Sequence, residues 1–423
     1  MTGSIIIFLL FYILLISEKV EKSILAVFFA AAAIGFKLID FETAMRSIDL
    51  NVIFLLIGMM TSVNILADTG FFEWIAIFVA KKMKGNGFGI FAMLLAITII
   101  FSALLDNVTT VILIAPMTIL ITQILELPTA PFLILEAMAS NIGGTATLIG
   151  DPPNIIIGSR VGLTFNDFII HVSPIIILIS VVFIFLSAFM LRKKLYIPKN
   201  VKLRVLEALP ENALRDKKRL YISLAIFVLI FLGFALHSAL GIEPGIIALG
   251  GMALMMFFAR SESDHLLKSV EWDSILFFIG LFIIIGAMEH NGVLDLVADL
   301  LIKMSAGNML LATLIILWGS AIFSSLLDNI PFVITMAPLV QKLAISFGAS
   351  GVGPHPLFWA LAIGACLGGN GTLIGASANV IIAKIGKNNN NPITFGQFSR
   401  LSIPLTLLVL VIASVYLWLR YLV

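Results

Sequence analysis

The stretch FSALLDNVTTVILIAP, residues 101–116, places Asp106 and Asn107 inside a run that is otherwise apolar. The stretch FSSLLDNIPFVITMAP, residues 323–338, repeats the pattern with Asp328 and Asn329. A carboxylate at the centre of a membrane-spanning helix costs at least ~2.5–3.5 kcal/mol on insertion scales, so two at corresponding positions need a reason. One interpretation is that each aspartate caps the helix that follows it. The other is that each binds a cation or a proton beside the free N–H groups of that helix.

The composition around these stretches is that of a membrane protein. Of the 423 residues, 60% are hydrophobic and 12% are charged, with a mean hydropathy of +1.13, whereas soluble domains carry roughly 25% charged residues. Apolar runs such as 3–16 and 174–191 approach the ~18–20 residues that cross a ~30 Å hydrocarbon core. We therefore predict an all-α polytopic protein of the cell (inner) membrane. The single cysteine, Cys366, excludes an intrachain disulfide.

The two halves of the chain are related by a duplication. A shift of 222 positions places SIDLNVIFLLIG (47–58) on SVEWDSILFFIG (269–280), and Asp106 on Asp328. After a three-residue insertion, GGTATLIGDPPN (143–154) aligns with GGNGTLIGASAN (368–379). We expect a first repeat over 1–191, a basic connector over 192–219 and a second repeat over 220–423.

Each repeat is expected to contain five crossings and one re-entrant hairpin, formed by two half-helices that meet at the LDN motif. The apolar segment 71–84, which ends in lysines, suits a helix lying in the membrane interface. The expected crossings are 3–17, 22–39, 50–67, 131–157 and 170–191, followed by 220–240, 244–259, 273–290, 357–383 and 401–421.

The distribution of basic residues sets the expected orientation. An odd number of crossings per repeat forces the second repeat to be inverted relative to the first. The connector 192–219 holds ten Lys and Arg and should be cytoplasmic, which puts twenty of the 26 Lys and Arg on that side and both termini outside. Inverted-topology repeats are typical of secondary transporters.

A second pair of polar breaks follows the hairpins. In NIGGTATLIGDPPN (141–154), the Gly-Gly and Pro-Pro pairs should interrupt a helix and expose backbone groups that a ligand or water can satisfy. The equivalent of Asp151 in the second repeat is Ala376. Asp151 could be a third titrating group, or a carboxylate at the outer mouth that fixes the turn. Glu136 has no acidic counterpart and is expected to mark the cytoplasmic end of its helix.

No nucleotide-binding or catalytic signature is present: GxxxxGK[ST], GxSxG and HExxH are all absent from the sequence. We therefore expect a protein that is not an enzyme, holds no cofactor and binds no nucleic acid. The hydrophilic connector has about 28 residues, too few for an ATPase domain. Energy for transport should come from a gradient of the coupling ion, H⁺ or Na⁺.

The motifs LDNVTT…AP, GGTATLIGDPPN, LDNIPF…AP and GGNGTLIGASAN resemble the signature segments of the ion transporter superfamily. The likeness covers essentially the whole chain and is strongest to the branch of arsenical-pump membrane proteins and the melanosomal P protein. More distant relatives are sodium-coupled di- and tricarboxylate carriers and sodium/proton antiporters. The resemblance implies a homodimer whose transport domain slides like an elevator against a scaffold and, in an arsenical pump, a separate ATPase subunit.

The resemblance also implies the residues that bind substrate and coupling ions. The first site would comprise Asp106, Asn107, Thr109, Gly143, Gly144, Thr145, Thr147 and Asn154, to which Asn141 and Asp151 of the same break are added. The second site would comprise Asp328, Asn329, Asn370, Gly371, Thr372, Ser377 and Asn379. If sodium is the coupling ion, its ligands would be Asp106, Asn107, Asp328 and Asn329.

The LDN tips guide the choice of cargo. Carboxylate carriers of the superfamily have a Ser-Asn-Thr tip instead. A fixed aspartate would repel a nearby carboxylate substrate by about 4 kcal/mol per close pair at an intermediate dielectric, unless sodium neutralises it. Paired aspartates suit a neutral or cationic cargo exchanged for protons, and arsenite, an uncharged hydroxide, satisfies this condition, as does sodium. With the resemblance to arsenical-pump proteins, we expect proton-coupled export of arsenite or antimonite. The alternatives are a sodium-coupled carrier of an organic or inorganic anion, a sodium/proton antiporter and a passive channel.

Overall fold

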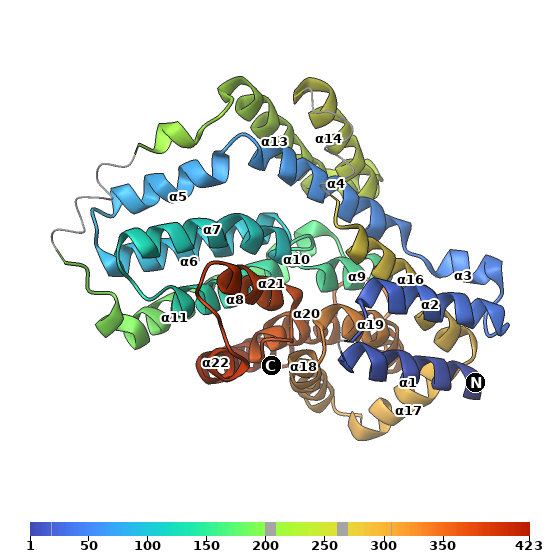
Figure 1. The fold of residues 1–423 in the computed structure, drawn as a ribbon. Coiled ribbons are helices and arrows are strands. Elements are labelled where there is room, and N and C mark those ends of the chain that lie inside the picture. Colours follow the sequence, from blue (N-terminus) through green and yellow to red (C-terminus); the bar gives the residue numbers. More distant parts are fainter. Residues whose placement is uncertain (18, 199–208, 260–269, 306) are drawn as a thin grey trace.

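The computed structural model describes residues 1–17, 19–198, 209–259, 270–305 and 307–423 (Figure 1). Every regular element in these ranges is a helix, which confirms the predicted fold class. The first half contains α1 (Thr2–Ser17), α2 (Lys22–Gly35), α3 (Phe41–Ser47), α4 (Leu50–Ala67), α5 (Phe71–Lys82), α6 (Gly87–Leu104), α7 (Asn107–Ile124), α8 (Thr129–Thr145), α9 (Pro152–Val161), α10 (Phe165–His171), α11 (Ser173–Leu191) and η1 (Arg192–Lys194). The second contains η2 (Pro210–Ala213), α13 (Lys217–Leu240), α14 (Pro244–Ala259), α16 (Trp272–His290), α17 (Val293–Ser305), α18 (Met309–Leu326), α19 (Asn329–Ser346), α20 (Pro356–Gly368), η3 (Gly369–Gly371), α21 (Ser377–Asn388) and α22 (Phe395–Tyr421).

The expected crossings all appear as helices, and the expected breaks fall between α8 and α9 and between α20 and α21. Among the described residues, nine helices are long and apolar enough to cross a membrane, and four of them are the arms of the two hairpins. The expectation of half-helices at the hairpins is therefore wrong in length. Each arm has 18 residues, about 27 Å at 1.5 Å per residue. Helices α7 and α19 reach this length by continuing through Pro116 and Pro338.

Two pairs of helices hold the halves together in a reciprocal way. Helix α16 packs on α2, and α14 packs on α4; α16 is the repeat counterpart of α4, as α14 is of α2. A Cβ atom added at Gly58 would lie 2.5 Å from the carbonyl carbon of Ala248, and one at Gly280 would lie 2.5 Å from that of Ala26. These positions are related by the same shift of 222. The close approach therefore occurs twice, as a pseudo-two-fold axis requires.

The direction of these helices shows that the repeats are inverted. At the N-terminal ends of α2 and α16, the Ser23 hydroxyl lies 3.4 Å from Oδ1 of Asp273; farther along both helices, Ala26 meets Gly280. Helix α16 thus runs parallel to α2. Helices α2 and α4 are joined through α3 and run in opposite directions (Figure 1). Since α16 is the counterpart of α4 but runs opposite to it, the second repeat is upside down relative to the first.

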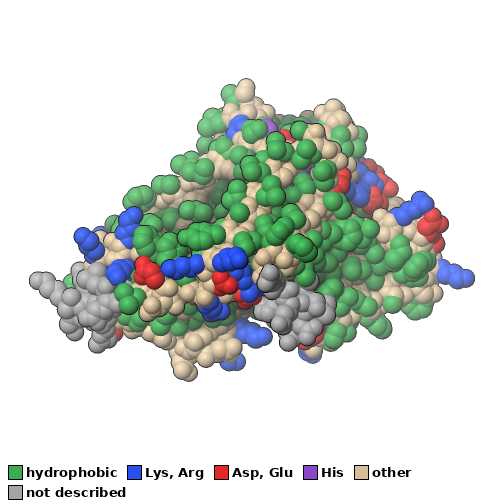
Figure 2. Space-filling view, turned by 90° about the horizontal axis from the view of Figure 1, so that it is seen from above, with side chains coloured by type: hydrophobic (Ala, Val, Ile, Leu, Met, Phe, Trp, Pro, Cys, Tyr) green, Lys and Arg blue, Asp and Glu red, His purple; other side chains and the backbone are tan. Residues whose placement is uncertain are grey.

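The outer surface suits a lipid environment. Figure 2 shows broad hydrophobic areas on one face, with charged side chains gathered in separate groups. Large apolar side chains such as Phe185 of α11, Leu229 of α13 and Phe257 of α14 are more than half exposed, as expected of helices that contact lipid. Residues 199–208 of the predicted connector, and Arg260 and Lys268, lie outside the described residues.

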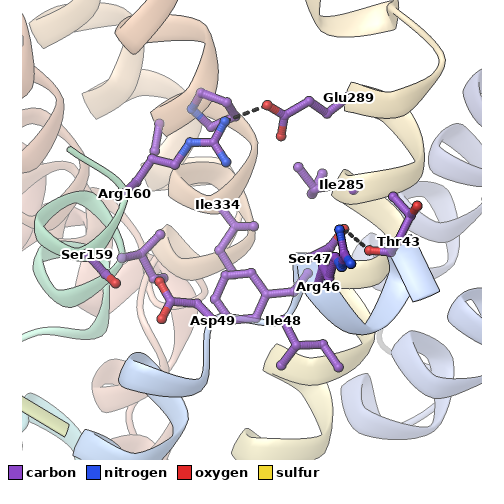
Figure 3. Close-up of a pocket in the computed structure, with 15 residues that line it drawn as sticks. Thr43, Arg46, Ser47, Ile48, Asp49, Ser159, Arg160, Ile285, Glu289 and Ile334 are labelled. Carbon is purple, nitrogen blue, oxygen red and sulfur yellow. Dashed lines mark hydrogen bonds and ion pairs between the residues drawn. The ribbon is translucent and has the colours of Figure 1, made fainter. Parts of the chain in front are cut away.

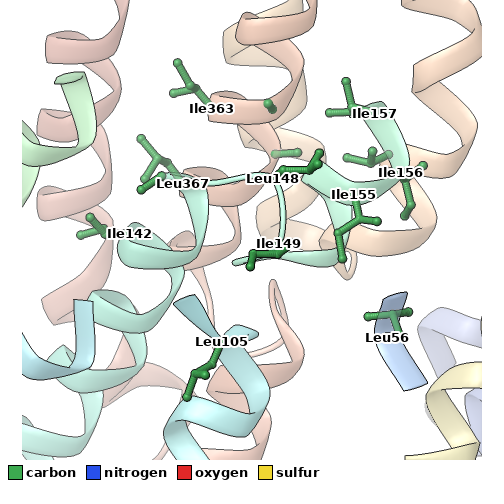
Figure 4. Close-up of a cluster of buried hydrophobic side chains, with 14 of the residues drawn as sticks. Leu56, Leu105, Ile142, Leu148, Ile149, Ile155, Ile156, Ile157, Ile363 and Leu367 are labelled. Carbon is green, nitrogen blue, oxygen red and sulfur yellow. The ribbon is translucent and has the colours of Figure 1, made fainter. Parts of the chain in front are cut away.

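Hydrophobic packing supports the first broken helix. In Figure 4, isoleucines and leucines of the α8–α9 break converge with side chains of α20. Leu148 and Ile149, within the break, are 3% exposed, and Ile363 and Leu367 of α20 are fully buried. The non-helical backbone is thus enclosed by protein, which is the condition for tolerating it at membrane depth.

Candidate substrate and ion site

The tip of the first hairpin is closed by its own residues. Asp106 is the N-cap of α7: its Oδ1 accepts a hydrogen bond from the Thr109 amide at 2.7 Å, and its Oδ2 accepts one from the Thr109 hydroxyl at 2.5 Å. The Thr110 hydroxyl donates to the Asp106 carbonyl at 2.9 Å. Asp106 therefore caps α7, as one interpretation of the sequence required. It is also 92% buried, with 8% of its surface exposed.

The tip of the second hairpin depends on other helices. Asp328 caps α19 with one bond of 3.3 Å from the Ile330 amide. Its Oδ2 forms an ion pair with Lys22 of α2 and accepts a hydrogen bond from the Ser377 hydroxyl at 2.7 Å. Lys22 was not among the predicted site residues, because its position in the sequence, before an apolar helix, resembles an ordinary interfacial lysine.

Each break in the broken helices is fastened by one asparagine. The Asn154 amide donates to the carbonyls of Gly144, Thr145 and Thr147 at 3.2, 3.2 and 2.9 Å. In the second repeat, the Asn379 amide donates to the carbonyls of Gly369 and Thr372 at 2.8 and 2.9 Å. These two predicted residues thus satisfy the carbonyls that the breaks release.

The breaks are also tied to the hairpins through equivalent threonines. The hydroxyl of Thr147 donates to the Ala103 carbonyl at 2.6 Å, and that of Thr372 donates to the Ser325 carbonyl at 2.5 Å. A further predicted residue, Gly371, has its carbonyl bonded to the Ser402 hydroxyl at 3.1 Å. Hairpin and broken helix of each repeat therefore form one hydrogen-bonded unit.

Buried amides join the two repeats at the centre. The Asn107 amide donates to Oδ1 of Asn141 at 3.0 Å, and the Asn141 amide donates to Oδ1 of Asn370 at 2.9 Å and of Asn379 at 3.0 Å. Cys366, the counterpart of Asn141, reaches Oδ1 of Asn154 at 3.5 Å. The structure thus brings both sets of predicted residues into one central cluster.

Two carboxylates lie elsewhere than one interpretation placed them. Asp151 is fully buried rather than at an outer mouth, and the Asn329 amide donates to its oxygens at 3.2 and 3.4 Å. Glu136 is 1% exposed and lies in the middle of α8, not at its cytoplasmic end. Glu136 is enclosed because every residue of α8 from Phe132 to Thr145 is buried. Asp151, at the start of α9, is enclosed beside Asn329 of the second hairpin.

A cavity of about 240 Å³ lies between the hairpin tips. Three repeat-related pairs line it together, so it sits on the pseudo-two-fold axis: Leu56 and Phe278, Val108 and Ile330, Pro152 and Ser377. Its charged lining consists of Asp106, Lys22 and Glu271 within the described residues.

Glu271, at the start of α16, was not among the predicted site residues. Burial raises its pKa to about 7, and the Asp106 carboxylate adds to the shift. The Glu271 carboxyl therefore changes its charge near neutral pH, and it does so beside Asp106. Among the described residues, no three His, Cys, Asp or Glu side chains are grouped so as to hold a metal ion.

A second cavity, of about 440 Å³, lies at the other end of α16 (Figure 3). Arg160 of α9 contacts Glu289 of α16 there at 2.5 Å and Gln341 of α19 at 3.1 Å. Asp49, the repeat counterpart of Glu271, lines this cavity and caps α4 through the Val52 amide at 3.2 Å. The two cavities thus occupy opposite ends of the same helix, and α9, α16 and α19 each contribute residues to both.

Comparison with known proteins agrees with this geometry. Residues 12–364 match the family described as "Citrate transporter". The chain is 40% identical to the 46 kDa membrane protein of Mycobacterium leprae over 99% of both chains. It is 31% identical to the P protein of Sus scrofa, covering 97% of this chain and 58% of that protein, so the predicted resemblance is confirmed.

A solved structure shares the fold. The crystal structure of the YdaH transporter of Alcanivorax borkumensis, described as having an unusual topology, matches with a TM-score of 0.61 at 13% sequence identity. The match covers 90% of this chain and 88% of that one. With a family match over most of the chain and apolar spans throughout, this protein belongs to the citrate transporter family and is a multi-pass membrane transporter.

Proposed function

We propose that this protein is a secondary transporter that exports arsenite or antimonite, as uncharged hydroxides, in exchange for protons. The observation that carries the proposal is the charge at the centre of the molecule. Asp106, Asp151 and Asp328 are all buried there, and Lys22, the basic side chain in the described lining, is already paired with Asp328. Such a site repels a di- or tricarboxylate and suits a neutral cargo and protons.

Asp106 and Asp328 are proposed as the proton or ligand sites, with hydroxyl and amide groups of the breaks as further ligands of the cargo. Among the described residues, the side chain of Asp106 accepts hydrogen bonds from uncharged groups, namely the amide and hydroxyl of Thr109. A buried carboxylate without a cationic partner favours its protonated form, so a proton can be exchanged there at low cost. The elevator movement, homodimer, cytoplasmic connector and any ATPase partner belong to the same proposal.

An elevator movement is supported by the way the helices group. The reciprocally packed helices α2, α4, α14 and α16 form one group, and the hairpins and broken helices form the other. Within the described parts of the chain, two ion pairs cross between the groups, Lys22 with Asp328 and Arg160 with Glu289. Sliding of one group past the other would break both and open the opposite cavity.

A second candidate is sodium-coupled transport of a carboxylate. It is favoured by the N-termini of α7, α9, α19 and α21, which all begin at the central cluster and carry partial positive charge. The description of the matching family points the same way. Sodium bound by Asp106, Asn107, Asp328 and Asn329 would then neutralise the tips.

Purified protein in proteoliposomes separates the candidates. We expect an imposed pH gradient to drive arsenite accumulation and Asp106→Asn to abolish it. Asp40→Asn is the matched control, because Asp40 caps α3 through the amide and hydroxyl of Thr43 with the same geometry, but at the surface. Sodium-driven citrate uptake without pH-driven arsenite uptake would establish the second candidate instead, and sodium flux against protons without either cargo would indicate an antiporter.

A further inference from the structure

Glu136 of α8 is a buried carboxylate that the central cluster does not use. It is 1% exposed. Neither of its side-chain oxygens has a hydrogen-bond partner in the part of the chain that the structure describes, and it forms no ion pair there. Leaving an isolated charge in such surroundings is costly, and buried carboxylates avoid the cost by binding a proton.

Glu136 lies in a line of polar groups at the interface of α7 and α8, which we call the α7–α8 seam. At one end, the hydroxyls of Thr122 and Thr129 are 2.9 Å apart. In the middle, the buried Thr118 hydroxyl lies near the Glu136 carboxyl, but no hydrogen bond joins them among the described residues. The members of the seam are Thr122, Thr129, Thr118, Glu136, Ser140 and Asn107.

At its other end the seam meets the hairpin tip. The Ser140 hydroxyl donates to the Asn107 carbonyl at 2.8 Å, one residue from Asp106. Ser140 follows Glu136 by one helical turn on the same face of α8. Thr118 and Thr122 are likewise one turn apart on α7. Polar groups therefore run from the loop between α7 and α8 to the central cavity, in an interface that is otherwise apolar.

The groups around Glu136 leave its charge uncompensated. Helix α8 packs against α6, α7, α11, α20, α21 and α22. The first four carry no Asp, Glu, Lys, Arg or His, and the Cys366 thiol of α20 is directed to Asn154. The basic residues Lys384, Lys387 and Arg400 of α21 and α22 are exposed, as is Arg420. The repeat counterpart of Glu136 is Leu361, so only the first hairpin unit has this group.

We propose that Glu136 is a proton-binding site, loaded and unloaded along the α7–α8 seam as the transporter cycles. On loading, a carboxylate oxygen takes one proton from water at the Thr122–Thr129 end and the residue becomes neutral. On unloading, the proton is released to water in the central cavity beside Asp106, Glu136 becomes negatively charged again, and the charge of the first hairpin unit changes by one. The inference rests on the proposed proton coupling, and it adds the residue that delivers the proton.

The test combines infrared spectroscopy with transport. In wild-type protein in lipid, a protonated-carboxyl band should titrate with pH, and Glu136→Gln should remove it. Thr118→Val, which removes only the neighbouring hydroxyl, should shift the midpoint of that band. In proteoliposomes, Glu136→Gln should slow pH-driven transport at least about tenfold, while exchange of labelled for unlabelled cargo, which needs no net proton movement, persists.

The two readouts separate this inference from the proposed function. The infrared titration needs no cargo, so a titrating Glu136 band supports the site even if arsenite is not transported. Glu136→Leu reproduces the side chain found at Leu361 and checks that the fold tolerates a neutral residue. A band that does not titrate, or a Glu136→Gln protein with the wild-type rate and pH profile, would overturn the proposal.

Discussion

The two hairpin tips share the LDN motif but hold their aspartates in different ways. Asp106 is bound within its own helix, by the amide and hydroxyl of Thr109. Asp328 makes one longer bond to its own helix and reaches out to Lys22 and Ser377. Proline at position 331, the counterpart of Thr109, explains the difference, since it offers neither an amide proton nor a hydroxyl.

This difference assigns unequal tasks to equivalent residues. The charge of Asp328 is balanced by Lys22 of α2, which belongs to the group of reciprocally packed helices. This ion pair can therefore stabilise one position of the hairpins relative to that group. Asp106 has no such partner among the contacts described and faces the cavity together with Glu271. The first hairpin is therefore the better candidate for proton exchange, and the second for linking exchange to movement.

Neutralising the two aspartates should give the largest effect and the clearest contrast. Asp106→Asn should lower proton-driven transport on the order of 100-fold without loss of folding, because asparagine caps helices as well as aspartate. Asp328→Asn should lower it less. Initial rates in proteoliposomes, with thermal unfolding as a check on folding, measure both. Equal losses at the two positions would remove the proposed division of tasks.

Removing the partner of Asp328 should have a moderate effect. Lys22→Met leaves a largely buried carboxylate without its cation, but Lys22 is 43% exposed, so we expect a stability loss of only about 1 kcal/mol. Thermal unfolding in detergent should reveal it, and the double variant Lys22→Met/Asp328→Asn should recover most of it. If the double variant is as unstable as the sum of the two single variants, the pair is not coupled.

The pH dependence of transport should arise at the tip of the first hairpin, where Glu271 lies near Asp106. The pKa of Glu271 is raised to about 7, so above that pH its negative charge opposes loss of a proton from Asp106. Glu271→Gln removes this charge, and the pH profile of transport should lose its inflection near pH 7. Asp49→Asn changes the counterpart at the other cavity and should leave that inflection in place. An unchanged profile in Glu271→Gln would separate the residue from proton exchange.

Single hydroxyl deletions should give the smallest effects. Thr109→Val removes the hydroxyl bond to Asp106, and Ser377→Ala removes the one to Asp328. Each bond contributes about 1 kcal/mol, measurable by thermal unfolding. Because Lys22 remains beside Asp328, we expect Ser377→Ala to affect transport less than Thr109→Val. The reverse order would indicate that the second tip is the more sensitive one.

Most of the fold follows from local sequence. The LDN motifs predicted both hairpins and the glycine-rich motifs predicted both breaks, because such residues end or cap helices wherever they occur. The length of the hairpin arms was misjudged, because the expectation of half-helices rested on the polar LDN break, whereas each arm is an 18-residue helix. Glu136 was expected at the end of its helix but lies inside it, and the burial of Asp151 excludes the outer-mouth alternative. Sequence could not decide either point, because burial depends on neighbours that are remote in sequence.

The site was predicted only in part, because local motifs reveal some of its residues and the packing of remote helices supplies the others. Residues such as Asn154 and Asn379 lie in recognisable motifs, and the structure brings them together. Lys22 and Glu271 lie outside the motifs, and only the packing of α2 and α16 against the hairpins makes them part of the cavity. No local signal distinguishes them from other charged residues at helix ends.

By itself, the sequence determined that the chain is a duplicated, helical membrane protein with two polar tips, because helix length, capping and repetition are local properties. Tertiary structure alone decided that Lys22 forms an ion pair with Asp328, that Asp106 is held by Thr109 of its own helix, and that Glu136 is enclosed. Burial and pairing of charge depend on which helices meet, and in an inverted duplication each half supplies the neighbours of the other.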